Sequence, residues 1–493
     1  MAGVKSPPRL WTAFVVAGVG SVALCLAVAT GGPILEARWR LLVLLGVWTL
    51  AWGVAVAVAF RLPGRAALAA VLVAGVAVRL AALAGPPTLS DDLYRYAWDG
   101  RVQASGGNPY QWMPQARAVA GLREAWLWPD AQGCRDLRRP PGCTRINRPG
   151  VRTIYPPLAQ AWFATVYRLG GVEARHQAWQ LAGFGTELAL LALLPLALRA
   201  WGRDPRWTAL YALSPFPVVE VVNNGHVDGL AALLVVAGVA LAARTSPWRW
   251  AAAGAVIGAA AMVKLYPAVA LVGLVAAGRG RPRLVATGLA GAAAVAVGAY
   301  LPHVVSVGSR VLGYLPGYLR EERYASGERH LLTGALGVPG EVAAALAAAA
   351  VVAVVAVTVV RRVPVPAAAT LALGSVLLAL TPVQPWYAVV LLGLAAVAGA
   401  PAWAAVVAAG YPYFFAVILD SPRSGLIGRI GYGLALVAVL AAARSRRTNQ
   451  RPPSLQRADS ASPARSARAA TPSTPTSAHG NQGPTSGPDS TRT

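Results

Sequence analysis

Apolar runs long enough to cross a membrane recur along this chain from Leu10 to Leu440. A helix needs about 20 mostly apolar residues to cross the hydrocarbon core of a bilayer. Hydrophobic residues make up 56% of the chain and charged residues only 13%, whereas a soluble domain carries about 25% charged residues. A soluble protein with these runs would expose large apolar patches. The pattern therefore predicts an all-α polytopic membrane protein.

Hydropathy predicts a bundle of about 13–14 membrane helices, some of them too short to span a bilayer alone. Short segments between the predicted spans carry arginine, and alternating the spans from a cytoplasmic N-terminus places these segments inside, as the positive-inside rule requires. Arg38 and Arg40 break the pattern once. The spans are expected near 10–29, 41–60, 66–85, 178–199, 207–222, 228–244, 249–263, 266–278, 284–301, 341–360, 366–381, 386–400, 402–418 and 426–443.

Two connections are too long to be simple turns, and they divide the expected transmembrane domain, residues 1–443. Residues 86–177 and 302–340 are rich in aromatic residues, Pro, Gly and Arg, and we expect both to be large extracytoplasmic loops. Residues 444–493 are rich in Ser, Thr, Pro and Arg without apolar periodicity, which predicts a disordered cytoplasmic tail.

The net charge of +25 comes almost entirely from arginine, because Lys5 and Lys264 are the only lysines. Much of this charge lies in short connections and in the tail, so we interpret it as a topology signal with membrane lipids as partners. It does not indicate nucleic-acid binding. The chain contains no phosphate-binding loop, dinucleotide fingerprint or metal-ligand spacing, which argues against a nucleotide-driven cytoplasmic enzyme and predicts no metal cofactor.

The first group of residues suited to chemistry is Ser90-Asp91-Asp92, where the third predicted span ends. Paired carboxylates at a membrane exit suit a general base, a metal site or a cation pathway. Like charges this close raise each other's pKa, as does partial burial. The alternative is a helix N-cap, for which Ser and Asp are favoured. Aromatic residues that follow in the sequence favour a functional site.

A second group lies between later spans on the same expected outer side. His226 and Asp228 are ionisable residues at membrane depth, where such groups are costly and usually functional; the alternative is a polar turn. Lys264 joins two short predicted helices and suits a lipid phosphate, unless it snorkels to the surface. Cys134 and Cys143 lie in the first loop, where an oxidising compartment favours a disulfide.

Several segments, in this order, resemble the polyprenol-phosphate-mannose-dependent α-1,6-mannopyranosyltransferases, which are actinobacterial members of the GT-C class. The resemblance extends over roughly residues 85–400. It rests on Asp91-Asp92-Leu93-Tyr94-Arg95-Tyr96-Ala97-Trp98-Asp99-Gly100-Arg101, Gly107-Asn108-Pro109-Tyr110, Ile154-Tyr155-Pro156-Pro157, Asn224-Gly225-His226-Val227-Asp228-Gly229, Lys264-Leu265-Tyr266-Pro267 and Gln384-Pro385-Trp386-Tyr387.

The resemblance implies a GT-C-like bundle and an inverting mannosyltransferase at the outer face of the plasma membrane. The donor would be polyprenyl phosphate mannose and the acceptor a mannan-type glycolipid such as lipomannan, with both termini cytoplasmic. Asp91 or Asp92 would be the catalytic base, with Asp91 favoured. The implied substrate-binding residues are Arg95, Arg101, Tyr155, His226, Asp228, Lys264 and Trp386. A transporter or flippase of a lipid-linked or polar substrate, and a GT-C enzyme with another sugar, are the alternatives.

Overall fold

The computed structural model describes residues 8–171, 173, 175–324 and 326–449. The chain divides into a unit of residues 1–442 and a second unit of residues 443–493. Throughout the described part the regular elements are helices, without a strand, which confirms the all-α class. The last helix, α20 (Ser424–Asn449), continues through 444–449, where the sequence predicts the tail to begin. Arginine, which is frequent at 444–449, is a strong helix former, and the rest of the predicted tail lies outside the described residues.

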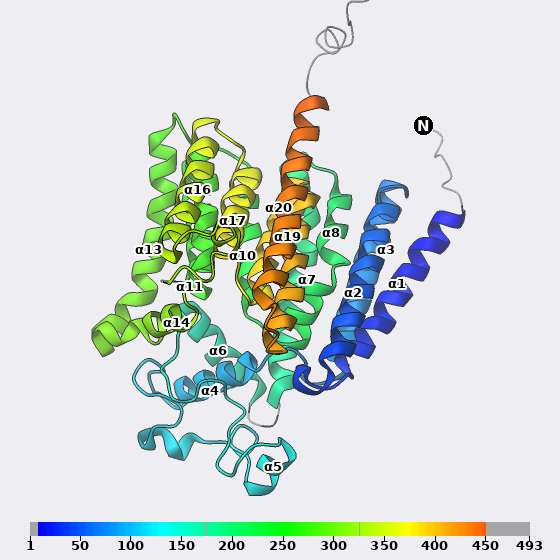
Figure 1. The fold of residues 1–493 in the computed structure, drawn as a ribbon. Coiled ribbons are helices and arrows are strands. Elements are labelled where there is room, and N and C mark those ends of the chain that lie inside the picture. Colours follow the sequence, from blue (N-terminus) through cyan, green and yellow to red (C-terminus); the bar gives the residue numbers. More distant parts are fainter. Residues whose placement is uncertain (1–7, 172, 174, 325, 450–493) are drawn as a thin grey trace, which may run out of the picture. The chain divides into compact units, whose positions relative to one another are not determined.

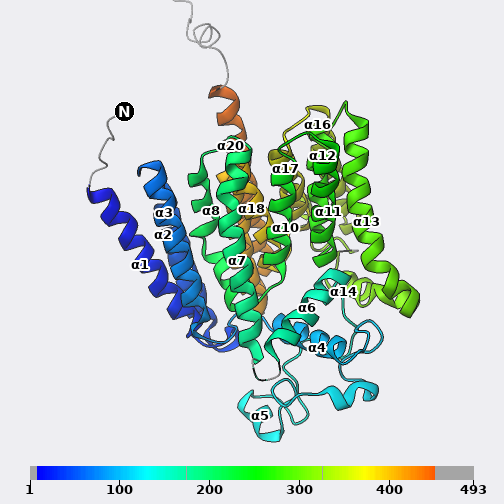
Figure 2. The same ribbon diagram turned by 180° about the vertical axis from the view of Figure 1, so that it is seen from behind.

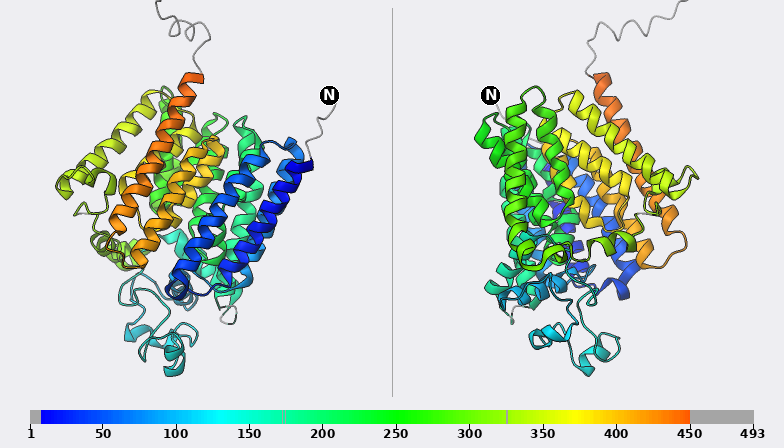
Figure 3. Two further views of the ribbon diagram at one scale, coloured as in Figure 1. Left: turned by 45° about the vertical axis from the view of Figure 1, so that its right-hand side comes forward. Right: turned by 90° about the vertical axis from the view of Figure 1, so that its left-hand side faces the viewer.

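Three long apolar helices open the first unit: α1 (Pro8–Ala29), α2 (Ile34–Ala59) and α3 (Gly64–Ala81), the last extended by η1 (Ala82–Ala84). They lie side by side at one edge of the unit, in blue in Figures 1 and 3. Each coincides with one of the first three predicted spans.

The first long loop is partly helical and lies at the end of the bundle where α3 finishes, in cyan in Figures 1 and 2. Gly100 lets α4 and α6 approach closely, because a Cβ there would stand 2.5 Å from the Phe163 carbonyl oxygen. The elements are α4 (Asp92–Ala104), η2 (Arg117–Leu122), α5 (Ala131–Asp136) and α6 (Pro157–Gly170), followed by the long helix α7 (Arg175–Ala200).

The single span predicted at 207–222 is wrong, because the chain there forms several short helices. Pro215 and Pro217 each lack a backbone N–H and interrupt a regular helix, and a π-helix follows them. The break predicted at Lys264 is present, since its backbone is extended (φ −144°, ψ 146°). The elements are η3 (Pro205–Trp207), α8 (Thr208–Ala212), α9 (Pro215–Pro217), η4 (Val218–Asn223), α10 (Asp228–Leu241), α11 (Pro247–Val263), η5 (Tyr266–Leu271) and α12 (Val272–Ala277).

The next helix, α13 (Pro282–Val307), extends beyond the span predicted at 284–301 and contains Pro302 in its last turns. The second long loop therefore begins at Gly308 rather than at residue 302. The remaining elements are α13 (Pro282–Val307), η6 (Gly308–Leu312), α14 (Leu315–Glu321), α15 (Leu331–Gly334), α16 (Gly340–Val360), α17 (Val365–Leu380), η7 (Pro385–Ala388), α18 (Val389–Ala398), η8 (Pro401–Trp403), α19 (Ala404–Ile418) and α20.

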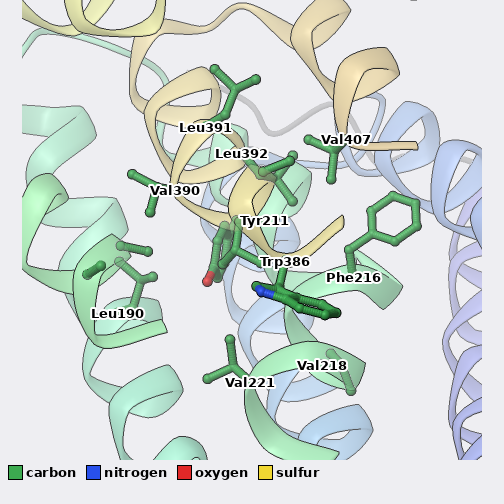
Figure 4. Close-up of a cluster of buried hydrophobic side chains, with 14 of the residues drawn as sticks. Leu190, Tyr211, Phe216, Val218, Val221, Trp386, Val390, Leu391, Leu392 and Val407 are labelled. Atoms are coloured by element: carbon green, nitrogen blue, oxygen red, sulfur yellow. The ribbon is translucent and has the colours of Figure 1, made fainter. Parts of the chain in front are cut away.

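Within the described residues, eight helical segments are long and apolar enough to cross a membrane, fewer than the predicted 13–14 spans. Several of the other predicted spans coincide with shorter apolar helices, among them α10, α17 and α18. A helix enclosed by protein does not have to match the bilayer thickness. Every residue of α18 is buried, and its Val390, Leu391 and Leu392 belong to the same buried hydrophobic cluster as Tyr211 and Phe216 (Figure 4).

The two ends of the first unit differ in character. The start of α1, the α2–α3 connection and the α16–α17 connection lie at the upper end in Figure 1. The helices α4, α5, α6 and α14 of the two long loops lie at the lower end. The long loops therefore meet at one end of the bundle although 130 or more residues separate them in sequence, and the site lies there.

Candidate functional site

A cavity of about 1010 Å³ opens where the two long loops meet the helical bundle. Its lining comes from the connection between α1 and α2 with the start of α2, from the first and second long loops, from the break at Lys264, from α17 and α19, and from residues 382–387 between α17 and α18. The cavity brings together most of the residues selected from sequence, namely Asp91, Asp92, Arg95, Tyr155, Lys264 and Trp386.

Asp91 occupies the N-cap position of α4, but its side chain makes no capping hydrogen bond. Instead the Ser90 hydroxyl accepts a hydrogen bond from the Asp92 backbone N–H at 3.2 Å. The helix-cap interpretation therefore does not account for the Asp91 carboxylate, which lines the cavity 3.4 Å from Arg139 Nη2. Burial against the cavity wall raises the pKa of Asp91 above its ordinary value, and the nearby guanidinium of Arg139 opposes this shift.

Asp92 is held more firmly than its neighbour. Asn147 Nδ2 donates to Oδ1 at 2.6 Å, and the Tyr155 hydroxyl donates to Oδ2 at 3.3 Å. The ring nitrogen Nδ1 of His226 lies 3.7 Å from Oδ2. These partners come from the first long loop and from the bundle, so Asp92 is oriented by both, whereas the Asp91 side chain is about half exposed and lines the cavity beside Arg139.

His226 and Asp228, expected to bind substrate, are buried behind the cavity wall and do not line it. The His226 ring is buried and stacks on Trp386 with ring centroids 4.2 Å apart. Asp228 is fully buried and accepts hydrogen bonds from Lys264 Nζ at 2.6 Å and from the Tyr266 hydroxyl at 3.0 Å. Each therefore orients a side chain that does reach the cavity.

Lys264 lies at the break between α11 and η5, where the extended backbone directs a cation towards the cavity. Its side chain is only 10% exposed and pairs with Asp228, and Nζ lies 4.9 Å from the centre of the Tyr387 ring. A buried, paired ammonium is not snorkelling to the surface, so that alternative is wrong. Lys264 therefore contributes a compact ammonium group to the wall of the cavity, beside several arginines.

The two arginines of α4 differ in position. Arg95 lines the cavity, but it is buried and donates to Asp99 Oδ1 at 3.0 Å and to the Val151 carbonyl at 3.2 Å. Arg101 is not among the lining residues and instead lies 3.3 Å from Glu124. A helix rises about 1.5 Å per residue, so Arg101 lies roughly 14 Å along α4 from Asp92. The structure therefore places this predicted substrate contact outside the cavity.

The structure adds lining residues that sequence reasoning missed. Arg148 bridges the two long loops, because its Nε lies 3.0 Å from Glu321 Oε1. Glu322 accepts from Arg329 Nη2 and from Gln384 Nε2, both at 2.9 Å. Three arginines of the second long loop, Arg310, Arg320 and Arg323, do not line the cavity. Arginines are frequent in both loops, so no local signal separates lining from non-lining ones.

A disulfide joins Cys134 and Cys143 in the first long loop, while Cys25 is free and buried in α1. The described part of the chain contains no group of three or more His, Cys, Asp and Glu residues arranged to hold a metal ion. The polar side chains that line the cavity are carboxylates, arginines, a lysine, aromatic and aliphatic hydroxyls, and the amides of Asn147 and Gln384.

Comparison with protein families finds that residues 153–383 match the model of glycosyltransferase family 87. No curated protein and no solved structure matches the chain. The matched region runs from the first long loop to the turn after α17 and includes Tyr155 and Lys264, while Asp91 and Asp92 precede it. Together with the apolar helices, this match indicates a membrane glycosyltransferase.

Proposed function

We propose that this protein is an inverting mannosyltransferase that moves mannose from polyprenyl phosphate mannose to a mannan-type glycolipid acceptor on the outer face of the plasma membrane. One observation carries the proposal. The carboxylates of Asp91 and Asp92 line the same cavity as the ammonium of Lys264, in a chain that matches a glycosyltransferase family. A base and a cation facing one cavity are what sugar transfer from a phosphate donor requires.

The apolar part of the cavity supports a donor carried on a lipid. Burial of hydrocarbon releases about 25 cal/mol for each Å² removed from water, so an isoprenoid chain would bind well against such a wall. A nucleotide sugar carries no hydrocarbon chain that could bind against this apolar wall. The apolar lining residues on α17 and α19 are Val376, Leu377, Leu380, Phe414, Val417 and Ile418.

In the proposed reaction, Asp91 accepts the proton of an acceptor hydroxyl, and the hydroxyl oxygen attacks the anomeric carbon of mannose. The bond from that carbon to the phosphate oxygen breaks on the opposite face, so the configuration inverts and polyprenyl phosphate leaves. Lys264 neutralises the charge that develops on the phosphate. Asp92 is held by Asn147 and Tyr155 and positions the acceptor. A monophosphate leaving group does not require a metal ion in this scheme.

The distribution of charge supports chemistry on the extracytoplasmic side. The predicted short arginine-bearing connections, such as those near Arg61 and Arg361, belong to the end of the bundle opposite the long loops (Figure 1). Arginine-rich short connections favour the cytoplasm. The long loops and the cavity would then face outwards, with the start of α1 inside.

Transfer in lipid nanodiscs tests the proposal, with labelled polyprenyl phosphomannose as donor and a short α-linked mannoside as acceptor. Removing a general base costs about 100- to 10,000-fold in rate, so we expect a loss in that range for Asp91→Asn and a smaller loss for Asp92→Asn. Asp420→Asn is the matched control, because Asp420 is exposed and does not line the cavity.

Two results would contradict the proposal. Full activity in both variants would show that neither carboxylate is the base. A wild-type protein that transfers no sugar from any polyprenyl phosphate donor, but moves a polar or lipid-linked substrate across vesicles, would identify a transporter instead.

A further inference from the structure

A disulfide-closed loop, residues 134–143, stands beside Asp91. Cys134 is fully buried, and its carbonyl accepts a hydrogen bond from the Arg139 backbone N–H at 2.9 Å. Just after the loop, the Thr144 hydroxyl and the Arg145 N–H both donate to the carbonyl of Leu127, at 2.8 and 2.9 Å. These hydrogen bonds to buried Leu127 hold the disulfide-closed loop at the rim of the cavity.

The Arg139 side chain reaches from this loop to the carboxylate. Its Nη1 donates to the Thr144 carbonyl at 2.6 Å, and its Nη2 lies 3.4 Å from Asp91 Oδ2. The first contact holds the guanidinium plane, and the second directs it at Asp91. Both side chains are partly exposed, so the pair adds little to folding stability. Its effect falls on the charge of the carboxylate.

Four charged or titratable groups surround Asp91. Arg139 and Arg145 come from the disulfide-closed loop and its continuation, while Asp92 and Tyr94 come from α4. Burial raises the pKa of Asp91, and Arg139 is the strongest influence in the opposite direction. Without it, the carboxylate would take up a proton at a higher pH.

We propose that Arg139, held by the loop that the Cys134–Cys143 disulfide closes, is a positioning residue that keeps the Asp91 carboxylate ionised and oriented for proton transfer. The inference rests on the proposed function, since it assigns Asp91 as the base. Neighbouring Arg138 supplies the contrast, because it pairs with Glu36 at 3.7 Å and does not line the cavity.

The pH profile of transfer tests this assignment. A base must be ionised, so activity falls as the pH drops through the pKa of Asp91. In Arg139→Gln, we expect the acid side of the profile to move to higher pH and the rate at the alkaline plateau to fall, because the carboxylate loses both the nearby charge and the contact that orients it. Arg139→Lys should lie between the two, because it keeps the charge without the bond to Thr144. Arg138→Gln should match wild type.

A second measurement does not depend on transfer. Carbodiimide with an amine labels protonated carboxyl groups, and mass spectrometry of the peptide containing Asp91 gives the pH at half-labelling. We expect this midpoint to rise in Arg139→Gln and, in the same direction, in the Cys134→Ser/Cys143→Ser double variant, and to stay constant in Arg138→Gln.

The outcomes separate the two proposals. An unmoved acid side and labelling midpoint in Arg139→Gln would overturn the role of Arg139. If the KM for the donor also rose, Arg139 would instead contact the donor phosphate. A wild-type midpoint in the double cysteine variant would overturn the role of the disulfide. If the wild-type protein transferred no mannose, the proposed function would be contradicted. The labelling midpoint would still show whether Arg139 keeps the Asp91 carboxylate ionised.

Discussion

Two of the buried ion pairs in the helical unit, Arg79–Glu187 and Lys264–Asp228, differ in what surrounds them. Arg79 of α3 and Glu187 of α7 lie 2.6 Å apart with both side chains fully buried. Lys264 and Asp228 also lie 2.6 Å apart, but the lysine is 10% exposed and lines the cavity. The first pair connects helices, and the second presents a cation to open space.

The partners of each pair explain this difference. Arg79 Nη1 also donates to the carbonyls of Gly75 and Ala212, and the Tyr211 hydroxyl donates to Glu187 Oε1. The guanidinium and the carboxylate therefore make their hydrogen bonds to protein atoms, and neither faces a ligand site. A charged residue at membrane depth is often taken as a functional site. The two pairs differ in contact with a cavity rather than in burial of charge, and the proposed function assigns a role in the reaction only to the pair that reaches the cavity.

The largest effect is expected when one partner of the interior pair is removed. Arg79→Met leaves Glu187 buried without its cation, which costs about 3–5 kcal/mol of folding free energy. Equilibrium unfolding by SDS in mixed micelles measures this loss. Arg199→Met is the control, because Arg199 is exposed at the end of α7. Equal stability of the two variants would show that the Arg79–Glu187 pair carries no structural role.

A smaller but more specific effect is expected at the cavity. The double variant Lys264→Met/Asp228→Asn removes both charges, so no uncompensated charge is buried and the protein should fold. Loss of one stabilising donor costs about 100- to 1,000-fold in rate, and we expect transfer to fall in that range. Near wild-type transfer by a folded double variant would remove Lys264 from the proposed mechanism.

The smallest effect is expected when the whole interior group is replaced. In Arg79→Met/Glu187→Met/Tyr211→Phe, no buried charge or hydroxyl loses its partner, so stability should return to within about 1 kcal/mol of wild type. Transfer per folded molecule should equal that of wild type. A folded triple variant with impaired transfer would show that this pair also serves the reaction, which would erase the contrast with Lys264–Asp228.

Local patterns in the sequence predicted more of the fold than of the site. The apolar runs predicted the long helices, because hydrophobicity and helix length are properties of a contiguous segment. The helix break at Lys264 was also predicted, from two short apolar runs and a following proline. The interruption of the predicted span at 207–222 was not, since the effect of Pro215 and Pro217 depends on how the broken segment packs.

The site shows the opposite balance. Asp91, Asp92 and Lys264 were selected by charge and position, but their partners Asn147 and Arg139 carry no local signal among so many similar loop residues. They are recognised only because the first long loop folds back over the start of α4.

The sequence by itself determined that this chain is a helical membrane protein with paired carboxylates after its third span and a lysine between two short helices, because composition and periodicity are local. Only the tertiary structure decided which charges face the cavity. Glu187 and Asp228 are both buried acidic residues beside a cation, and Arg95 and Arg101 lie on the same short helix. What separates them is the surrounding packing, which depends on contacts between residues far apart in the chain.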